Sequence, residues 1–289
     1  MRIGRVIELW RYPVKSMGGG RIDRARVDEK GLPGDRGWAI RDEAAGEIRG
    51  AKKFPVLLQC QARYLEEPSG ASIPVAEITL PNGEVVRADS SEASAKLSAL
   101  IGKKVTIWPR RPADDLDHYR RGLPDSPDME TELRQIFGRL EDEPLPDLMA
   151  FPPEILEFSS PLGTYFDAFP IHLLTTSSLA ELSRLNPEAA FDRRRFRPNL
   201  LIELDEVKPG FAELDWCGRE VTIGGATLKI EMPVVRCSMT THPQGELPKD
   251  PTVLRTIVRE AAQSVGVYAS VVRAGEIAAG DSLTLRKPE

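Results

Sequence analysis

One cysteine in the C-terminal third of the chain has the setting that metal chemistry requires. A β-forming run that starts at Met232 ends at Arg236 and Cys237, and a polar loop with proline and glycine follows as far as Gly245. A thiolate is a soft ligand for a transition metal, and a neighbouring guanidinium favours the thiolate form. A small apolar residue at a strand end would give the same local pattern. From spacing alone both interpretations stay open.

A cluster of arginines provides a second candidate for chemistry. Four arginines lie within the five positions from Arg193 to Arg197, just before the β-forming run 200–203. A guanidinium fixed at the start of a strand can bind a phosphate through two parallel hydrogen bonds, which predicts an anion-binding role for Arg197. For the other three arginines a solvated basic turn is the competing interpretation.

Three more loops carry anion-binding residue types. Lys15 and Ser16 precede three consecutive glycines, and Arg36 lies between a glycine-containing turn and a predicted strand. Four hydroxyl groups, from Thr175 to Ser178, stand at a predicted helix N-terminus, where backbone N–H groups attract anions or carbonyls. A hairpin loop and ordinary helix capping are the structural alternatives, and the lysine loop does not have the spacing of a P-loop.

The three histidines contribute less. His118 is expected to be solvated, and His172, within an apolar run, is expected to be a core histidine. His242 lies five residues after Cys237, which suggests a Cys-His hydrolase, but no third orienting residue or oxyanion loop can be named.

Composition excludes several classes of protein. The chain has 289 residues, 41% of them hydrophobic and 29% charged, which indicates a folded protein of two domains or one elaborate domain. A net charge of -5 argues against a general attraction to nucleic acid or an anionic membrane. There is no membrane-spanning run or signal peptide, so a cytoplasmic location is expected. The three cysteines form no C-x-x-C pair, and no nucleotide-binding or common hydrolase motif occurs.

Short β-forming runs interrupted by Gly, Pro and Asn predict a mainly β fold, a β-barrel with a few helices in the α+β class. The expected strands are 3–10, 104–108, 200–203 and 266–272, with hairpins in 75–86 and 220–235. Helices are expected at 89–101, at 129–140, from a capping box at Ser178 to before Pro187, and from an N-cap at Asp250 towards Gly266.

A proline- and acid-rich stretch divides the chain. We predict an N-terminal unit over residues 1–110, an exposed connector over 111–144 and a second unit over 145–289.

Five short loops in register resemble those of the MOSC family, the molybdenum cofactor sulfurase C-terminal domain. They are the segments 12–16, 34–38, 196–200, 236–241 and 266–269, with Gly280 and Asp281 near the end. The resemblance extends over nearly the whole chain, and its first part is similar to the N-terminal β-barrel module that precedes many MOSC domains. Within the family the chain is similar to the branch of the mitochondrial amidoxime reducing component and its bacterial relatives.

This resemblance implies a molybdenum cofactor, a metal bound to a pyranopterin. It implies that Cys237 ligates molybdenum and is the catalytic residue. It implies that the cofactor is bound by Lys15, Ser16, Arg36, Thr175, Ser177, Arg197, Asn199 and Arg236. Two departures from related sequences are the segment Gly50–Lys52, where relatives often have an arginine, and Thr176, where some reductases have an aspartate.

The activity implied is a molybdenum-dependent oxidoreductase that reduces N-hydroxylated small molecules. Electrons would come from a separate ferredoxin-like or cytochrome b5-like protein with its reductase, because the chain carries no four-cysteine ferredoxin segment. A carrier that presents the cofactor, or a persulfide on Cys237, is the alternative. Pyridoxal phosphate on Lys15 is a third possibility, disfavoured by the absence of the α/β pattern of pyridoxal enzymes. No nucleic-acid partner and no membrane span are expected.

Overall fold

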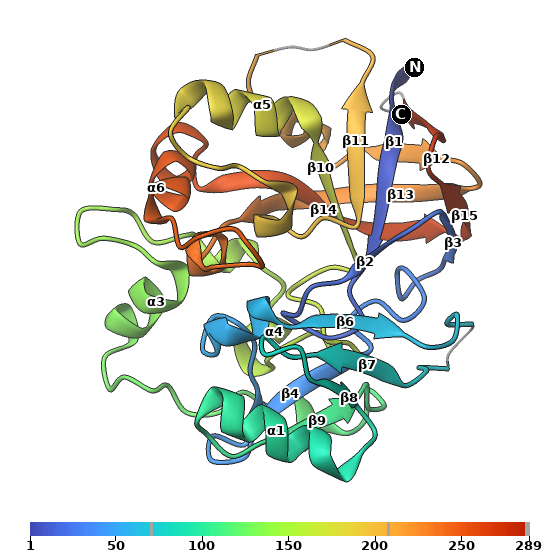
Figure 1. The fold of residues 1–289 in the computed structure, drawn as a ribbon. Coiled ribbons are helices and arrows are strands. Elements are labelled where there is room, and N and C mark those ends of the chain that lie inside the picture. Colours follow the sequence, from blue (N-terminus) through green and yellow to red (C-terminus); the bar gives the residue numbers. More distant parts are fainter. Residues whose placement is uncertain (70–71, 207–208, 287–289) are drawn as a thin grey trace.

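The computed structural model describes residues 1–69, 72–206 and 209–286 and arranges them as two stacked units (Figure 1). The upper unit is a barrel in which the described residues supply seven strands. Their order is β11-β10-β14-β13-β12-β16-β1, and pairing of β1 with β11 closes the ring. The strands are β1 (Arg2–Arg11), β10 (Ile171–Thr175), β11 (Leu200–Leu204), β12 (Glu220–Ile223), β13 (Ala226–Val235), β14 (Ser264–Arg273) and β16 (Ser282–Leu285). The predicted mainly β class is confirmed.

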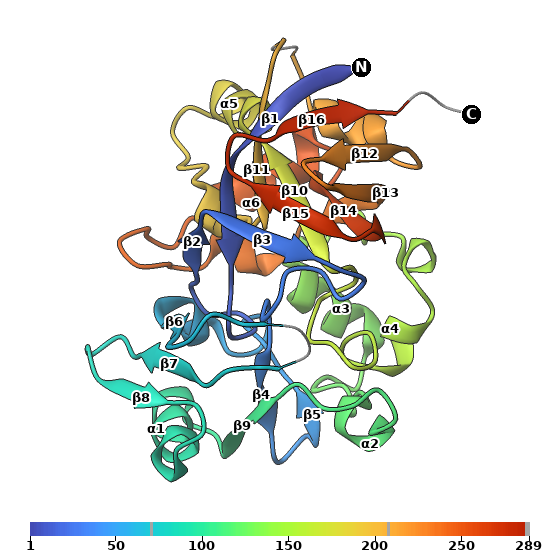
Figure 2. The same cartoon turned by 90° about the vertical axis from the view of Figure 1, so that its right-hand side faces the viewer.

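The barrel is held together by alternating inward residues. Val6 and Leu9 of β1 are fully buried and pair across the closure with Ile202 and Leu200 of β11. Leu228 and Val267 extend the same core along β13 and β14. Two short strands, β3 (Arg24–Val27) and β15 (Gly275–Ala278), pair beside the barrel (Figure 2), and β2 (Gly20–Ile22) pairs with β1. The sequence pattern missed β15 and β16, which follow the strand expected to be the last.

The first strand belongs in space to a barrel otherwise built from the second half of the chain. β1 pairs with β11 and with β16, whose residues lie about 200 and 280 positions later. Local alternation predicts the strand but does not reveal partners so distant in sequence. The barrel therefore takes one strand from the first segment of the chain. The division at residues 110 and 144 stays a prediction, and it concerns only the order of segments along the sequence.

The lower unit contains two three-stranded sheets and one long helix. β4 (Trp38–Asp42) lies between β5 (Glu47–Ile48) and β9 (Val105–Pro109), and β7 (Ala76–Thr79) lies between β6 (Gln61–Tyr64) and β8 (Val85–Arg87). Isolated bridges from Val14 to Trp38 and from Gly18 to Gln61 connect the loop after β1 to both sheets. The loop that contains Lys15 and Ser16 is therefore fixed between the two units.

Helix boundaries follow the capping residues. α1 (Ser91–Ile101) starts at Ser90, whose side chain accepts from the N–H of Ala93, and ends at Gly102 with a φ of 75°. α6 (Pro251–Glu260) starts at the expected N-cap Asp250 but ends well before Gly266. The N-cap of α5 (Thr176–Leu185) is Thr175 rather than Ser178, because the Thr175 hydroxyl accepts from the Ser178 N–H.

The connector is more ordered and more buried than its composition suggests. It forms α2 (Leu116–Tyr119) and α3 (Met129–Phe137), and it is followed by a short 3-10 turn, η2 (Leu148–Ala150), and by α4 (Glu154–Glu157). His118, expected to be solvated, is buried, and its Nε2 lies 2.7 Å from the Tyr165 hydroxyl. That expectation was wrong because the ring packs against the neighbouring tyrosines, 119 and 165. In Figure 1 α3 lies beside both units.

Candidate functional site

Cys237 lies at the barrel rim, immediately beyond β13. It is half-buried, and a 3-10 turn, η5 (Ser238–Thr241), begins directly after it. The preceding residue, Arg236, points into the protein: its guanidinium donates to the carbonyl oxygens of Val265 (2.8 Å) and Phe196 (3.1 Å). Burial lowers the pKa of Arg236 to about 10, so it remains charged at neutral pH. Its donors hold neighbouring loops in place, and direct contact with a cofactor stays a prediction.

His172 connects the cysteine loop to the arginine cluster. Arg236 Nη2 lies 2.8 Å from His172 Nε2, and His172 Nδ1 lies 3.3 Å from the carbonyl oxygen of Arg197. Arginine can only donate, so Nε2 accepts and the proton is on Nδ1, which donates to the carbonyl. Burial, with the nearby charge of Arg236, holds the pKa of His172 well below its usual range. This histidine is therefore neutral, and it is a buried core histidine as the sequence suggested.

The neutral histidine predicts a loss of stability in mild acid. A depressed folded-state pKa means that only the unfolded state takes up a proton as the pH falls below about 6.5. The contribution of neutral His172 to the free energy of unfolding is complete above that pH, and it falls by about 1.4 kcal/mol for each pH unit below it. Between pH 6.5 and 5 we expect the wild type to lose about 2 kcal/mol more unfolding free energy than His172→Gln. Equal losses in urea titrations of the two proteins would contradict this assignment.

Three of the predicted residues adopt strained backbone conformations. Ser16, Arg36 and Arg197 have φ values of 68°, 47° and 56°, a left-handed region that residues with side chains rarely occupy. Within the described residues only Ala262 and Gln263 join them among non-glycines. Such strain is found mostly where the surroundings impose it, typically at functional sites.

The two arginines share one aromatic ring. The guanidinium carbons of Arg36 and Arg197 lie 4.6 and 4.3 Å from the ring centre of Tyr12. Arg197 Nη1 donates to the carbonyl oxygen of Met17 at 2.6 Å. Burial, followed by the like charge of Arg36, lowers the pKa of Arg197 to about 10. Two cations held this close provide a local anion site in an otherwise acidic protein.

A buried carboxylate positions this cluster. Asp35 accepts from the backbone N–H of Tyr12 (2.8 Å), from Asn199 Nδ2 (3.0 Å) and from Arg36. Asn199 also accepts from the N–H of His172 (3.1 Å) and donates to the carbonyl of Trp10. Both the oxygen and the nitrogen of the Asn199 side-chain amide therefore form hydrogen bonds within the protein. Contact between Asn199 and a cofactor stays a prediction.

Lys15 lies on the other side of the cluster, beside a carboxylate that the sequence did not reveal. Its Nζ donates to the carbonyls of Tyr165 (2.8 Å) and Phe166 (3.3 Å) and to Asp167 Oδ1 (2.8 Å). Burial lowers the pKa of Lys15, although Asp167 opposes the shift. The neighbouring Ser16 hydroxyl accepts from the N–H of Ala51 at 2.9 Å.

Asp167 is surrounded by positive charge. Burial alone would raise its pKa, but the charges of Lys15, Lys52 and Arg36 hold that pKa well below its usual range. Its side chain is still 47% accessible. The ring centre of Tyr268 of β14 lies 5.9 Å from that of His172, and burial, followed by the charge of Asp167, raises the pKa of Tyr268. Asp167 and Tyr268 thus add an ionised acceptor and a protonated hydroxyl to the site.

The hydroxyl cluster occupies a different environment. Thr175 and Ser178 donate to Glu213 Oε2 at 2.8 and 2.6 Å, and the Ser177 hydroxyl lies 2.9 Å from that of Thr175. All four side chains are buried, and Glu213 comes from the 3-10 turn η4 (Ala212–Trp216). The structure groups Thr175 and Ser177 around a carboxylate at the start of α5 and not with Lys15, Arg36 and Arg197.

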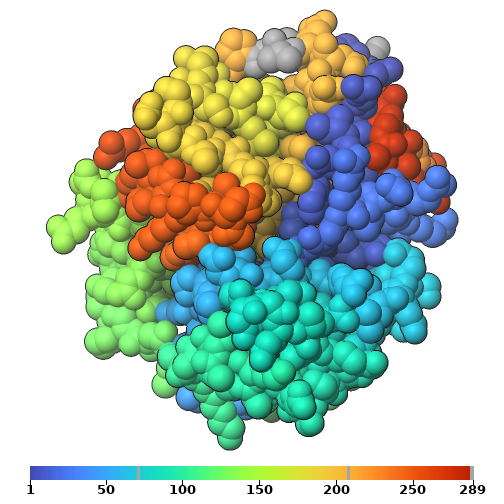
Figure 3. All heavy atoms as spheres, viewed as in Figure 1, coloured from blue at the N-terminus to red at the C-terminus, as the bar shows by residue number. Residues whose placement is uncertain are grey.

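A recess of about 320 Å³ lies between the barrel loops and the lower unit. Two buried donors on its wall have no partner among the described residues, Arg197 Nη2 and Gln244 Nε2. Gln244 follows Cys237 in the same loop, but the sequence did not single it out. Arg193 stacks on the Trp10 ring at 4.3 Å on the same wall. In Figure 3 the orange, gold and blue segments that carry these residues meet above the lower unit. Buried donors that lack a partner, on residues that line a recess, suit an anionic ligand.

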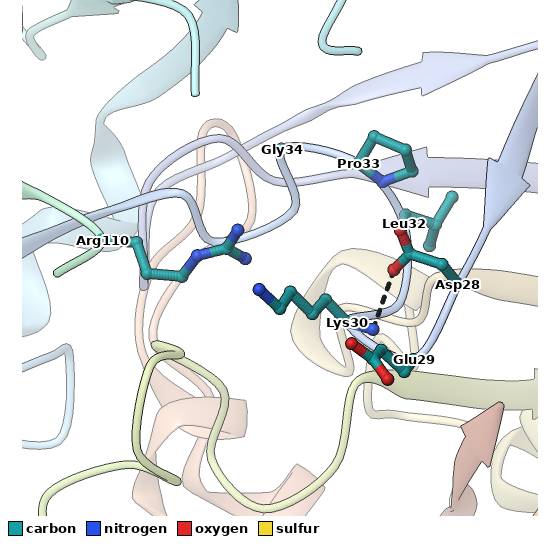
Figure 4. Close-up of a pocket in the computed structure, with 7 residues that line it drawn as sticks. All are labelled: Asp28, Glu29, Lys30, Leu32, Pro33, Gly34 and Arg110. Atoms are coloured by element: carbon teal, nitrogen blue, oxygen red, sulfur yellow. Dashed lines mark hydrogen bonds between the residues drawn. The ribbon is translucent and has the colours of Figure 1, made fainter. Parts of the chain in front are cut away.

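A second pocket, of about 240 Å³, has mixed charge. Figure 4 shows the Lys30 and Arg110 side chains reaching into the same space, while Asp28 and Glu29 lie along its edge. The Lys30 backbone N–H donates to Asp28 Oδ1 at 2.8 Å. None of the predicted site residues lines this pocket.

Family models identify the class of protein to which the chain belongs. A family model of the MOSC domain matches residues 163–284, and one of the MOSC N-terminal beta barrel domain matches residues 3–101. The two matches together cover most of the chain, which therefore belongs to the MOSC family. Among curated proteins, mitochondrial amidoxime-reducing component 1 of Mus musculus is 26% identical over 261 residues, and the match spans 83% of this chain and 66% of that protein.

Solved structures resemble the chain less closely. The YUAD protein from Bacillus subtilis has 13% sequence identity and a TM-score of 0.47, covering 99% of this chain and 97% of that one. YiiM from Geobacillus stearothermophilus has 18% identity and a TM-score of 0.31, over 41% and 55% of the two chains. In the described part of our chain, no helix combines the length and apolar character that crossing a bilayer requires.

Proposed function

We propose that the chain binds a molybdenum cofactor between its two units, with Cys237 as the sulfur ligand, and reduces N-hydroxylated compounds. The observation that carries this proposal is the pair of unpartnered donors, Arg197 Nη2 and Gln244 Nε2, in a recess linked to the cysteine loop by Arg236 and His172. A soft sulfur on the loop that also carries Gln244, together with donors for an anion, would fit a metal–pterin phosphate. The name of the amidoxime-reducing relative supports the choice of substrate class.

Different residues of the chain would bind different parts of the cofactor. Cys237 would bind the metal, and Arg197 with Gln244 would hold the anionic group. Arg36, placed by Asp35 and by its contact with Tyr12, would add positive charge. When bound, the cofactor would supply two-electron oxygen-removal chemistry, which protein side chains lack.

Asp167 and Tyr268 would orient the substrate. An ionised carboxylate accepts hydrogen bonds from the N–H groups of an amidoxime, and a protonated phenol donates to its oxygen. The pKa shifts of both groups keep them in these protonation states near neutral pH, because Asp167 is held low and Tyr268 is held high. A separate electron-donor protein, of ferredoxin or cytochrome b5 type, and a cytoplasmic location complete the proposal.

Turnover distinguishes this function from that of a carrier. Protein purified from a host that makes the cofactor is mixed with benzamidoxime and reduced methyl viologen, and benzamidine is measured by chromatography. We expect amidine to form in proportion to bound molybdenum. Molybdenum-containing protein that forms no more amidine than a heat-denatured control would instead favour the carrier, with Cys237 holding the cofactor or a persulfide.

Arg197→Ala tests the anion site. The substitution removes the guanidinium of a residue that lines the recess but leaves the backbone carbonyl that accepts from His172 and Arg36. A charge-assisted hydrogen bond lost at such a site is worth about 1.5–3 kcal/mol, so we expect pterin retention to weaken by about 10- to 100-fold. Arg194→Ala is the matched control, because Arg194 lines the same recess but pairs with Asp192 and Glu246. Equal pterin loss from both variants during dialysis would argue against a specific role for Arg197.

A further inference from the structure

We infer that Arg139 is a positioning residue for Cys237 and that α3 is a strap holding the cysteine loop against both units. Both polar groups of the backbone just before Cys237 are bound from outside the barrel ladder. The N–H of Arg236 donates to the carbonyl of Gln263 at 2.8 Å, and its carbonyl accepts from Arg139 Nη2 at 2.9 Å. The residue that leads into the cysteine is therefore held through both its N–H and its carbonyl.

Arg139 is built into the protein for this contact. It is 5% exposed, and its other donors bind Gln263 Oε1 at 2.9 Å and the carbonyl of Phe137 at 2.5 Å. Among the described residues it makes no ion pair with a carboxylate, although burying a cation without one is costly. Its partner Gln263 is itself left-handed, with a φ of 67°. The strained residue Gln263 and the unpaired buried charge of Arg139 both contact Arg236, the residue before Cys237.

The residue after Cys237 is held by the same segment. The Ser238 hydroxyl donates to the carbonyl of Ile136 at 3.1 Å, and Arg255 of α6 donates to the carbonyl of Gly138 and to Glu143. Gly138 has a φ of 63°, and a Cβ there would lie 3.2 Å from the Cα of Ser238. The end of α3 thus packs directly on the cysteine loop, and a side chain at Gly138 would be strained, both by the left-handed φ and because its Cβ would lie 2.8 Å from Leu254 Cδ2.

The other end of the strap is anchored in the lower unit. Lys53 binds Glu132 of α3 and lies 2.9 Å from Asp125, which Arg49 also binds at 2.8 Å. Glu132 and Arg49 are buried. A connector that merely spanned the units would need no such contacts on both sides of the site. The role of Cys237 itself rests on the proposed function, but the restraint on its loop does not.

Hydrogen exchange of the cofactor-free protein tests the restraint separately from activity. In Arg139→Gln we expect amides of residues 236–241 to exchange about 10- to 100-fold faster, as the loss of a hydrogen bond to a charged group predicts. Arg139→Lys keeps a charged donor for the Arg236 carbonyl and should restore much of the protection. Arg121→Gln is the control, because the Arg121 guanidinium donates to the carbonyls of Ile155 and Phe158, which follow the connector, and to none in the cysteine loop as the structure describes it.

Two results with Arg139→Gln would overturn the inference. One is exchange at 236–241 that is the same in Arg139→Gln as in Arg121→Gln. The other is faster exchange spread evenly over the barrel, which would mark a general loss of stability. If Arg139→Gln fails to fold, Gly138→Ala takes its place in the comparison with Arg121→Gln. Faster exchange confined to residues 236–241 then supports the strap, and unchanged exchange there overturns it.

Discussion

Replacing Cys237 with alanine is expected to reduce turnover to background while leaving the barrel folded. The cysteine is half-buried at the rim, and its sulfur supports no part of the four hydrophobic cores. Truncating such a side chain costs about 1 kcal/mol or less. The sulfur is, however, the soft ligand on which the proposed metal site depends. Amidine formation and the thermal midpoint, measured on the same preparations, separate these two effects.

A second cysteine supplies the control for this substitution. Cys217, at the end of η4, is also half-buried and lies against the barrel core, away from the recess residues. Cys217→Ala should keep full activity with a similar change in midpoint. Full activity in Cys237→Ala with molybdenum still bound would contradict the proposal that Cys237 is the sulfur ligand of the metal. Equal loss of activity in both variants would show that the effect is structural.

Replacing Asp35 with alanine is expected to cost about 3 kcal/mol of unfolding free energy, because it breaks a buried ion pair by removing one partner. Asp35 is 1% exposed and satisfies the backbone N–H of Tyr12, the amide of Asn199 and the guanidinium of Arg36. Without it, these three groups lose their acceptor inside the protein. Urea titration at pH 7 measures the change.

The isosteric variant Asp35→Asn sharpens this test. An asparagine keeps one oxygen acceptor for the N–H of Tyr12 but loses the negative charge beside Arg36. We expect the free energy of unfolding of Asp35→Asn to lie between that of wild type and that of Asp35→Ala. A loss below about 1 kcal/mol in Asp35→Ala would mean that water replaces the carboxylate, so that it would not be what holds the arginine cluster.

Local features of the fold could be read from the sequence, and long-range features could not. The N-cap Asp250 and the glycine turn at Gly224 determine nearby backbone, so the start of α6 and the β12–β13 hairpin appear as expected. The pairing of β1 with β16 joins residues about 280 positions apart, and no local pattern specifies it. β15 and β16 are only four residues each, too short to show a clear alternation.

The same contrast between local and long-range features applies to the candidate site. Cys237, Arg36 and Arg197 lie in loops whose residue types already suggested chemistry. Asp167 was missed because it is a lone acid in an unremarkable segment, and only the fold places it beside Lys15. Arg139 was missed because proline and acid content made its connector look solvent-exposed. Hydroxyl groups at a helix start, such as Thr175, fit both capping and ligand binding, and here the structure turns them to Glu213.

The molybdenum and pterin content of the purified protein tests the central claim most directly. Wild type and Cys237→Ala are prepared from a host that makes the cofactor, and metal and pterin are measured per chain. The account predicts about one molybdenum and one pterin per wild-type chain, with the molybdenum lost from the variant. Wild-type protein that carries neither, although folded and prepared beside a known molybdenum enzyme from the same host, would contradict it.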